Sequence, residues 1–416
     1  MDSSASTHSP AVQHLLSVTG IPTAAGREWR VVAHIRRWCQ GHGSALVLSE
    51  DASGNLVVRL ARHAAAGPRP LYITAHLDHP GFVIESIGGP DQLVLSFRGG
   101  VMAEYFVEAP ITLFTADDRA VEAVLTGQLA AAAVPAGSAG FGDHYTARLT
   151  GPASTAAALR PGDVGRFAMP GPEVDAGGIL HTPACDDLSA VAAALAAMDE
   201  LVARAARGEA VPDTRLLFTR AEEIGFIGAI AACRHVTMAK DAIVIALENS
   251  RSFADSPIGG GPIVRVGDRI SIFTPSVTAA CADRAEKLFG GASVVRAQQK
   301  AGEGAKRPWQ RKLMAGGACE ATVFCTEGYN ATCVCLPLGN YHNMANLAEV
   351  QAGTYDAARM GPPRAAREFI SVADYLGMVD LLISLGSEHP VEPTGPRGSF
   401  AGRIDSLWAK SGSVLA

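Results

Sequence analysis

Short, almost continuously apolar runs recur along this chain, separated by segments with helical periodicity. They read LYITA from residue 71, RLLFT from residue 215, AIVIAL from residue 242 and ATCVCLPL from residue 331. Strands that are apolar on both sides are typical of a sheet covered by helices on both faces. The pattern therefore predicts an α/β fold with a doubly wound mixed sheet and helices on both faces.

Helices are predicted between these strands. The strongest candidate is the alanine- and leucine-rich segment 188–206, in which apolar residues recur at helical spacing. Further helices are predicted at residues 11–20, 27–40, from 227 onward, 277–288 and 369–385.

The pattern changes between residues 88 and 178. Short β-like runs are separated there by glycine, proline and aspartate, and no convincing helix is visible. We expect a small all-β domain at residues 88–178, inserted into a discontinuous catalytic domain formed by residues 1–87 and 179–390. The proline- and glycine-rich residues 391–416 are expected to form a C-terminal tail.

Composition narrows the class of protein. The chain has 416 residues, of which 48% are hydrophobic and 18% charged, so it is globular. No apolar run is long enough to span a bilayer, and the first residues show no secretory signal. The net charge of −6 argues against a nucleic-acid partner. Eight scattered cysteines in apolar context indicate buried thiols in a reducing compartment, so we expect a cytoplasmic protein.

Polar side chains directly follow each apolar run, and two more precede the helix at 188–206. In open α/β sheets, ligands bind beyond the carboxyl ends of the strands, so we expect these residues to meet at one edge. They are His76 and Asp78, Glu222 and Glu223, Glu248, His342, and the pair Asp186-Asp187.

The first of these groups suggests a metal ligand with its support. His76 and Asp78 are two residues apart on extended chain, so their side chains point to the same side. The imidazole can bind a metal ion while the carboxylate holds its other ring nitrogen.

The whole set suits a pair of metal ions. Two histidines and several carboxylates are nitrogen and oxygen ligands that suit zinc, with cobalt or manganese as substitutes. Three ligating carboxylates and one bridging hydroxide would neutralise two divalent ions, and hydroxide is the nucleophile of a hydrolase. One further carboxylate is then needed to move protons. Glu222 and Glu223 can supply one ligand and one free base.

In their order along the chain, these residues resemble the co-catalytic zinc exopeptidases. The closest resemblance is to the glutamyl/leucyl/deblocking aminopeptidase family, whose members form hollow tetrahedral particles. It covers most of residues 12–386 and includes the β insert between the first two groups. Further segments similar to the family are LRPGD (159–163), GGGP (259–262) and GGACEA (316–321).

The resemblance implies a role for each residue. Asp186 would bridge two metal ions, one held also by Glu223 and His342, the other by His76 and Glu248. Two divalent ions per subunit are implied, with zinc as the first choice.

The same resemblance implies that Glu222 is the general base and that Asp78 orients His76. It also implies a cis peptide bond between Asp186 and Asp187. The reaction would remove the N-terminal residue of a small peptide. The subunits would form a homo-oligomer, such as a dodecamer, with the β insert as the oligomerisation domain.

The chain departs from the family pattern near the second ion. The family usually has aspartate at the position of Glu248, an arginine at that of Leu188, and Gly-Thr-Asp-Ala where residues 318–321 read Ala-Cys-Glu-Ala. Its Asp-Glu-Ile-Gly-Phe becomes Asp-His-Pro-Gly-Phe at residues 78–82. Two alternatives to an aminopeptidase therefore stay open: a dinuclear metal amidase acting on a non-peptide or modified amide, and a non-catalytic binding protein on a peptidase scaffold.

Three further features have weaker interpretations. The segment 296–312 holds six basic residues, which suggests a solvated loop, or else a lid or part of a pocket for an acidic substrate. His79 and His181 lie near the expected ligands, and we expect them to support those ligands at most.

Overall fold

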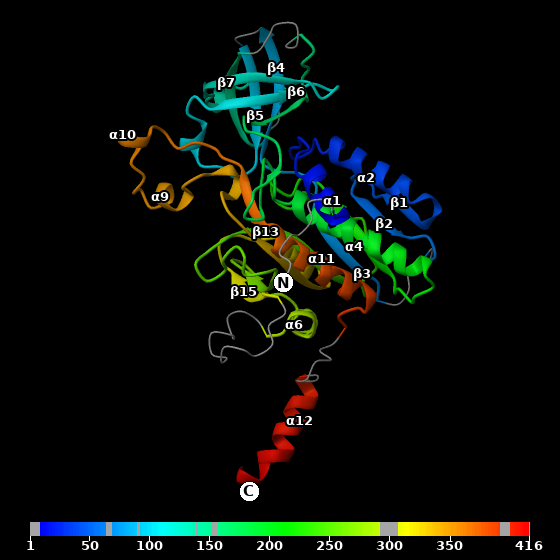
Figure 1. Cartoon of the computed structure of the whole chain (residues 1–416). Helices are drawn as coiled ribbons and strands as arrows, with labels where there is room; N and C mark the ends of the chain where they lie inside the picture. The colour runs from blue at the N-terminus through cyan, green and yellow to red at the C-terminus, as the bar shows by residue number, and fades with distance from the viewer. Residues whose placement is uncertain are drawn as a thin grey trace.

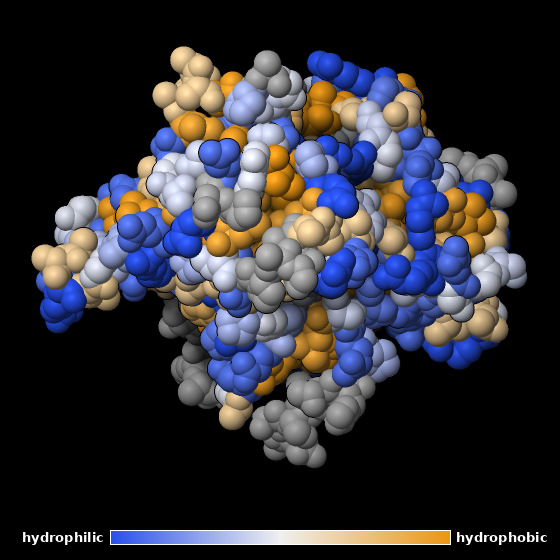
Figure 2. All heavy atoms as spheres, turned by 90° about the horizontal axis from the view of Figure 1, so that it is seen from above, coloured by the Kyte–Doolittle hydropathy of each residue, from blue (hydrophilic) through white to orange (hydrophobic). Residues whose placement is uncertain are grey.

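The computed structural model describes residues 9–63, 69–89, 92–135, 137–138, 140–150, 157–291, 307–391 and 400–415. A large α/β body carries a small β-barrel at one end, and the C-terminal helix extends from the opposite end (Figure 1). Seen from the barrel end, the surface mixes hydrophilic and apolar residues (Figure 2).

The body is built on a mixed sheet that has eight strands within the described ranges. Its order is β1-β2-β12-β3-β13-β16-β14-β15. The central strands β12, β3, β13 and β16 are parallel, whereas β2 and β14 join them antiparallel. The strands are β1 (Leu46–Glu50), β2 (Leu56–Leu60), β3 (Leu71–His76), β12 (Thr214–Thr219), β13 (Ile243–Arg251), β14 (Ile263–Asp268), β15 (Gln310–Met314) and β16 (Asn330–Leu338).

Helices cover both faces of this sheet, as predicted. One face packs against α1 (Pro10–Val18), α2 (Trp29–Gly41), α4 (Leu188–Ala206), α6 (Pro275–Phe289) and α11 (Val372–Ser387). The other face packs against α5 (Ile227–Arg234) and α8 (Glu320–Thr326). The predicted helix at 188–206 is confirmed with the same bounds, and its first eleven residues are all buried.

The small domain is a closed barrel with the order β4-β5-β8-β7-β6-β9. Its interior is rich in aromatic rings, among which Phe106 and Tyr145 stack with centroids 4.4 Å apart. Because β4 starts at Gly81, the barrel begins before residue 88; the domain boundaries at 88 and 178 stay a prediction. The strands are β4 (Gly81–Gly89), β5 (Gln92–Arg98), β6 (Pro110–Phe114), β7 (Ala120–Gln128), β8 (Asp143–Leu149) and β9 (Val164–Phe167).

A three-stranded sheet with the order β10-β11-β17 lies beside the body. It consists of β10 (Glu173–Val174), β11 (Ile179–Thr182) and β17 (Glu368–Ser371). The helix predicted at 369–385 is therefore wrong at its start. The hydroxyl of Ser371 accepts a hydrogen bond from the Asp374 backbone N–H, so the chain turns from strand to helix α11 at this residue.

The region expected to form a C-terminal tail, residues 391–416, contains a helix that was not predicted, α12 (Phe400–Ser411). It exposes Ile404, Leu407 and Trp408 along one side. No described helix is long and apolar enough to cross a membrane. The remaining short helices are α9 (Leu347–Gln351), α10 (Ala357–Met360), η1 (Gly43–Ala45), η2 (Ala103–Phe106), η3 (Ala131–Ala133), η4 (Tyr341–Asn343) and η5 (Gly412–Leu415).

Candidate metal centre

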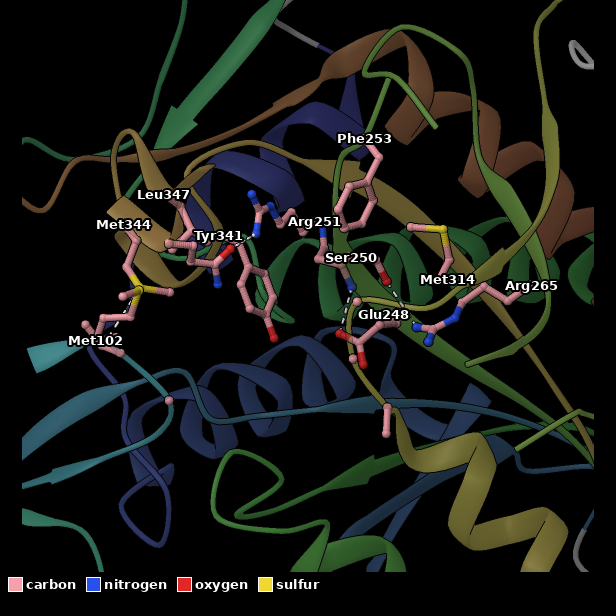
Figure 3. A pocket seen from close by; sticks show the side chains of 17 residues that line it. Met102, Glu248, Ser250, Arg251, Phe253, Arg265, Met314, Tyr341, Met344 and Leu347 are labelled. Carbon is pink, nitrogen blue, oxygen red and sulfur yellow. Dashed lines mark hydrogen bonds between the residues drawn. The ribbon is translucent and has the colours of Figure 1, made fainter. Parts of the chain in front are cut away.

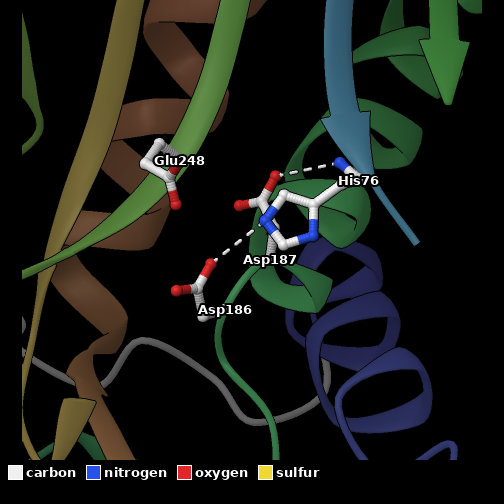
Figure 4. Close-up of side chains that lie close together, drawn as sticks. All are labelled: His76, Asp186, Asp187 and Glu248. Atoms are coloured by element: carbon white, nitrogen blue, oxygen red, sulfur yellow. Dashed lines mark hydrogen bonds and ion pairs between the residues drawn. The ribbon is translucent and has the colours of Figure 1, made fainter. Parts of the chain in front are cut away.

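The carboxyl ends of the parallel strands bring the predicted polar residues together. His76 is the last residue of β3, Glu248 lies in β13, and His342 lies in η4 directly after β16. Asp186 and Asp187 occupy the turn that leads into α4. Figure 4 shows His76, Asp186, Asp187 and Glu248 pointing toward one another.

Two overlapping groups of ligand atoms share Asp186. His76, Asp186, Asp187 and Glu248 each offer one such atom, and these atoms lie within 4.8 Å of one another. Asp186, Glu223 and His342 meet the same criterion. Nε2 of His76 lies 3.3 Å from Oδ1 of Asp186, and Nε2 of His342 lies 3.4 Å from Oδ2 of the same carboxylate. The two oxygens of Asp186 therefore face different histidines.

Several of these atoms are buried without a hydrogen-bond partner in the described part of the chain. They include Oδ1 of Asp186, Oε1 of Glu223 and Nε2 of His342. Nε2 of His342 also lies 3.5 Å from Oε2 of Glu223. Buried polar atoms are normally satisfied, so converging atoms with free lone pairs form a site that can hold a cation. The donor set of carboxylates and imidazoles fits a divalent ion such as zinc.

Glu222 lies beside this cluster. Its Oε2 is 3.9 Å from Nε2 of His76, and the residue is 9% exposed. A third group of ligand atoms consists of His76, Glu222 and Glu223. Glu222 is therefore close enough to reach a molecule bound at the cluster.

Asp78 holds the turn that carries Glu222 and Glu223. Its carboxylate accepts hydrogen bonds from the backbone N–H groups of Glu222 (2.9 Å) and Glu223 (3.0 Å). Nδ1 of His76 lies 3.1 Å from the backbone carbonyl oxygen of Asp78 and 3.5 Å from its Oδ1. The contact with His76 was predicted from the sequence, whereas the link to the turn after the neighbouring strand β12 was not.

A second buried carboxylate, Glu368 in β17, has the same kind of role and was not predicted. Its Oε2 accepts hydrogen bonds from the backbone N–H groups of Cys185 (2.6 Å) and Asp186 (3.1 Å). Its Oε1 accepts one from the backbone N–H of His342 (2.8 Å). Glu368 therefore ties together the two segments that carry Asp186 and His342.

Two contacts and the backbone conformation fix the orientation of His342. Its Nδ1 lies 2.7 Å from the carbonyl oxygen of Gly100, so a neutral ring donates a hydrogen bond there and leaves Nε2 free for a metal ion. The Tyr341 ring stacks on the imidazole with centroids 3.8 Å apart. His342 has a φ of +53°, in the left-handed region that few non-glycine residues adopt.

Burial and the closeness of several carboxyl groups shift the pKa values in this cluster. Burial, with the neighbouring carboxylates, raises the pKa of Glu223 and Glu248 well above the ordinary value. Burial also raises the pKa of Glu222. Burial would likewise raise the pKa of Asp186, but the two histidines beside its oxygens lower it overall. A bound cation would favour all the ionised carboxylates.

The predicted cis peptide bond between Asp186 and Asp187 is present. His79 is buried and interacts with the carbonyl oxygen of Asp186, and its Nε2 lies 3.1 Å from Oδ1 of Asn343. His181, by contrast, pairs with Asp175 at 3.1 Å, where both side chains are partly exposed. His79 therefore supports the cluster, whereas His181 interacts with Asp175.

The predicted basic segment 296–312 lies partly outside the described residues. Within its described part, Arg307 forms an ion pair with Asp380, and Lys312 lies 2.6 Å from Asp255.

The fold and the sequence resemble known proteins. A family model described as M42 glutamyl aminopeptidase matches residues 54–289. No curated protein matches the chain.

Similar solved structures include the TET1 peptidase of Pyrococcus horikoshii, with 20% identity and a TM-score of 0.67 over 91% of this chain and 99% of that one. An aminopeptidase from the archaeon Desulfurococcus kamchatkensis gives 18% identity and a TM-score of 0.66 over 92% and 95% of the two chains. An M18-family aminopeptidase from Thermotoga maritima gives 15% identity and a TM-score of 0.56 over 90% and 95%. These likenesses show that the fold is shared.

Proposed function

The chain belongs to the M42 glutamyl aminopeptidase family, and on this premise we propose that it is a metal-dependent aminopeptidase that removes the N-terminal residue of small peptides. The observation that carries the proposal is the position of Asp186, whose two carboxylate oxygens face His76 and His342. A carboxylate placed in this way suits a bridge between two cations.

We assign the ligands accordingly. Asp186 would help to hold both of two divalent ions, one together with His76 and Glu248 and the other together with Glu223 and His342. When bound, the ions would polarise the scissile carbonyl group and acidify the attacking water. The unpaired atoms of Asp186, Glu223 and His342 support this assignment.

Glu222 is the general base in this proposal. It stands next to the ligand Glu223 and within 3.9 Å of His76, yet the assignment leaves its carboxylate free. It takes a proton from the attacking water and returns it to the leaving amine. Asp78 positions Glu222 because it holds the backbone of the same turn.

Substitution of the two adjacent glutamates tests these roles. Glu222→Gln should keep the full metal content, measured by elemental analysis, while kcat falls by about 10²- to 10⁴-fold, because the base is removed and the ligands are not. Glu223→Gln is the matched control and should lower the metal content itself. Loss of metal from Glu222→Gln, or full activity in it, would contradict the assignment.

A substrate panel on the same preparation separates the alternatives. Turnover of free-amine aminoacyl anilides by fully loaded protein supports the aminopeptidase. Turnover of amides without a free α-amine alone would favour an amidase, and less than one metal ion per chain after zinc loading would favour a binding protein.

We also propose that the subunits form a homo-oligomer and act in the cytoplasm. The structure titles of TET1 relatives describe a dodecamer and assembly into a tetrahedron or a large octahedral shell. The barrel, which projects from the body, is the candidate oligomerisation domain. All eight cysteines are free thiols, which suits a reducing compartment.

A further inference from the structure

Two of the hollows in the described part of the chain differ in size and position. The cavity of about 360 Å³ beside Glu248 adjoins the candidate metal centre, and Figure 3 shows the side chains that line it. A larger groove of about 1130 Å³ lies between α1, α4, α6 and α11. None of the residues assigned to the metal centre lines this groove, so the proposed function leaves it without a role.

The groove between these helices has apolar side chains along its length. Leu376, Val379 and Ile383 of α11 line it on one side, and Leu288 of α6 lines it on another. Leu288, Leu376 and Ile383 pack against the core of the body but stay partly exposed in the groove. The groove therefore offers an apolar surface to a partner.

The charged residues that line the groove are already paired with groups of the body. A groove with paired charges is better suited to an apolar partner than to an ionic ligand. The pairs are Arg204 with Glu200 (3.0 Å), Arg284 with Glu388 (2.8 Å), Arg307 with Asp380, and Asp199 with His14 (2.7 Å) and His42 (2.8 Å).

The helix α12 presents an apolar stripe that the described structure leaves uncovered. Ile404, Leu407 and Trp408 are three and four residues apart, so they share one face, and each is 64–66% exposed. In Figure 1, α12 points away from the body. Helices of this length are marginal in water by themselves and gain most of their stability when the apolar face packs. The stripe therefore needs a surface that covers it.

The groove and α12 match in length. The helix has 12 residues and is about 18 Å long at 1.5 Å per residue. The part of α11 that lines the groove runs from Leu376 to Glu388, which is also about 18 Å. Asp405 and Lys410 lie outside the stripe by helical spacing, so neither charge has to enter the groove.

The connection between α11 and α12 bears on which groove the helix enters. Residues 388–399 separate the two helices and span at most about 40 Å when fully extended, so α12 can reach a neighbouring copy. Because α12 points away from the body, it would have to reverse its direction to enter its own groove. A second copy can present its groove on the side to which α12 points, and a twofold axis makes such an exchange reciprocal.

We propose that α12 docks in the groove of a second copy of this chain, and that two copies exchange their C-terminal helices in this way. Ile404, Leu407 and Trp408 then contact the apolar side chains that α11 and α6 contribute to the groove. This contact is separate from the barrel and from the metal centre, so the proposal does not depend on the aminopeptidase function.

Cross-linking between two versions of the full chain tests which groove α12 enters. One version carries Ser411→Cys, in line with the stripe, and the other carries Ile383→Cys in the groove and a tag that changes its mass. When both are produced together, a short bismaleimide should join one chain of each kind, seen by electrophoresis at the sum of the two masses. Seven of the eight native cysteines are buried and should not react. Lys410→Cys, outside the stripe, is the matched control and should not join the chains.

The contact should also depend on the apolar stripe. On the chain with Ser411→Cys, Leu407→Ser together with Trp408→Ser removes two of the three large side chains and should lower the cross-linked yield by about 10-fold or more. Asp405→Ser together with Glu388→Gln changes charges outside the stripe and should leave the yield nearly unchanged. Sedimentation should show smaller particles for the stripe variant than for the wild-type protein. Since both stripe residues are exposed, an unchanged melting temperature of the body is expected.

Three results would overturn the proposal. A chain that carries both added cysteines and cross-links only within itself would show that α12 covers its own groove. The absence of any cross-link between α12 and the groove would exclude the groove as its partner. Binding of wild-type protein to anionic phospholipid vesicles that the stripe variant loses, without a cross-link, would assign α12 to a membrane surface instead.

Discussion

Buried carboxylates that accept backbone hydrogen bonds fix the candidate metal centre. Asp78 holds the turn of Glu222 and Glu223, and Glu368 holds the segments of Asp186 and His342. Neither carboxylate is needed as a ligand in the proposed assignment. Both carboxylates nevertheless position the proposed ligands. Each accepts hydrogen bonds from backbone N–H groups, and a backbone held in this way limits where its side chain can lie.

Glu368→Gln should lower zinc affinity by about 10- to 100-fold. The amide places an NH₂ group where one carboxylate oxygen now accepts from a backbone N–H, so two donors would face each other. The measurement is a zinc titration against a competing chelator. Glu173→Gln, on an exposed glutamate that pairs with Arg367, is the control and should leave zinc affinity unchanged. Equal affinities in both variants would contradict the positioning role of Glu368.

The sequence predicted which polar residues would gather, because each of them directly follows an apolar strand or precedes the long helix. It could not predict Glu368, which lies 26 residues after His342 and directly before the predicted helix at 369–385. Its role became visible only when tertiary packing showed what its side chain contacts.

At the scale of elements, the glycine-rich loop between β13 and β14 is anchored to α11. The Asp374 carboxylate accepts hydrogen bonds from the backbone N–H groups of Gly259 (2.7 Å) and Gly261 (2.9 Å). Both glycines have a φ of +83°, which suits glycine. They differ in their surroundings, because a Cβ on Gly261 would overlap the carbonyl oxygen of Pro308, whereas one on Gly259 would meet open space.

Gly261→Ala should therefore destabilise the protein more than Gly259→Ala. The left-handed backbone costs each variant about 1–2 kcal/mol, and the clash with Pro308 adds to this only at Gly261. Denaturant unfolding monitored by circular dichroism gives both values. Equal losses in the two variants would show that the loop moves away from Pro308 at no cost.

Elements with strong periodicity were predicted well, and elements that depend on neighbours were not. The helix α4 is buried over its first eleven residues, of which only Ser189 is polar, so its sequence is easy to recognise. In β15 the sequence QRKLM is short and charged, and it becomes a strand because it pairs with β14 at the sheet edge. The strand β17 was read as part of α11, because its pairing with β11 cannot be seen in local sequence.

At the scale of the whole molecule, the end of α11 meets the sheet at His389. Nε2 of this histidine lies 3.1 Å from the hydroxyl of Thr214 in β12. Burial lowers the pKa of His389 to about 4, whereas an exposed histidine titrates near 6.5. The folded protein therefore resists protonation at a pH where the unfolded chain accepts the proton.

This difference predicts the direction of the pH dependence. The contribution of His389 to stability is fully present above about pH 6.5 and is lost as the pH falls toward about 4. His389→Gln should flatten the decline of the free energy of unfolding across this range by roughly 2 kcal/mol. The measurement is urea unfolding at a series of pH values, with His235→Gln on an exposed histidine as the control. An unchanged slope in His389→Gln would mean that other groups dominate the decline.

The fold class could be predicted from the sequence, because few architectures are compatible with buried strands that alternate with helices. The change of texture after residue 88 also indicated a separate β domain, and a closed barrel is present. The order of the strands and the direction of β14 could not be predicted from the sequence, since they depend on contacts between distant segments. The helix α12 was missed because the proline and glycine residues around it dominate that region.

The carbonyl oxygen of Gly100, between β5 and η2, holds the imidazole of His342, and the next two residues line the cavity beside Glu248. The barrel therefore cannot be replaced without changing contacts in the α/β body. A chimaera that received its barrel from a relative would carry foreign contacts at His342, the proposed metal ligand, and at the wall of this cavity. Exchange of the barrel is therefore expected to change the surroundings of His342 as well as the barrel itself.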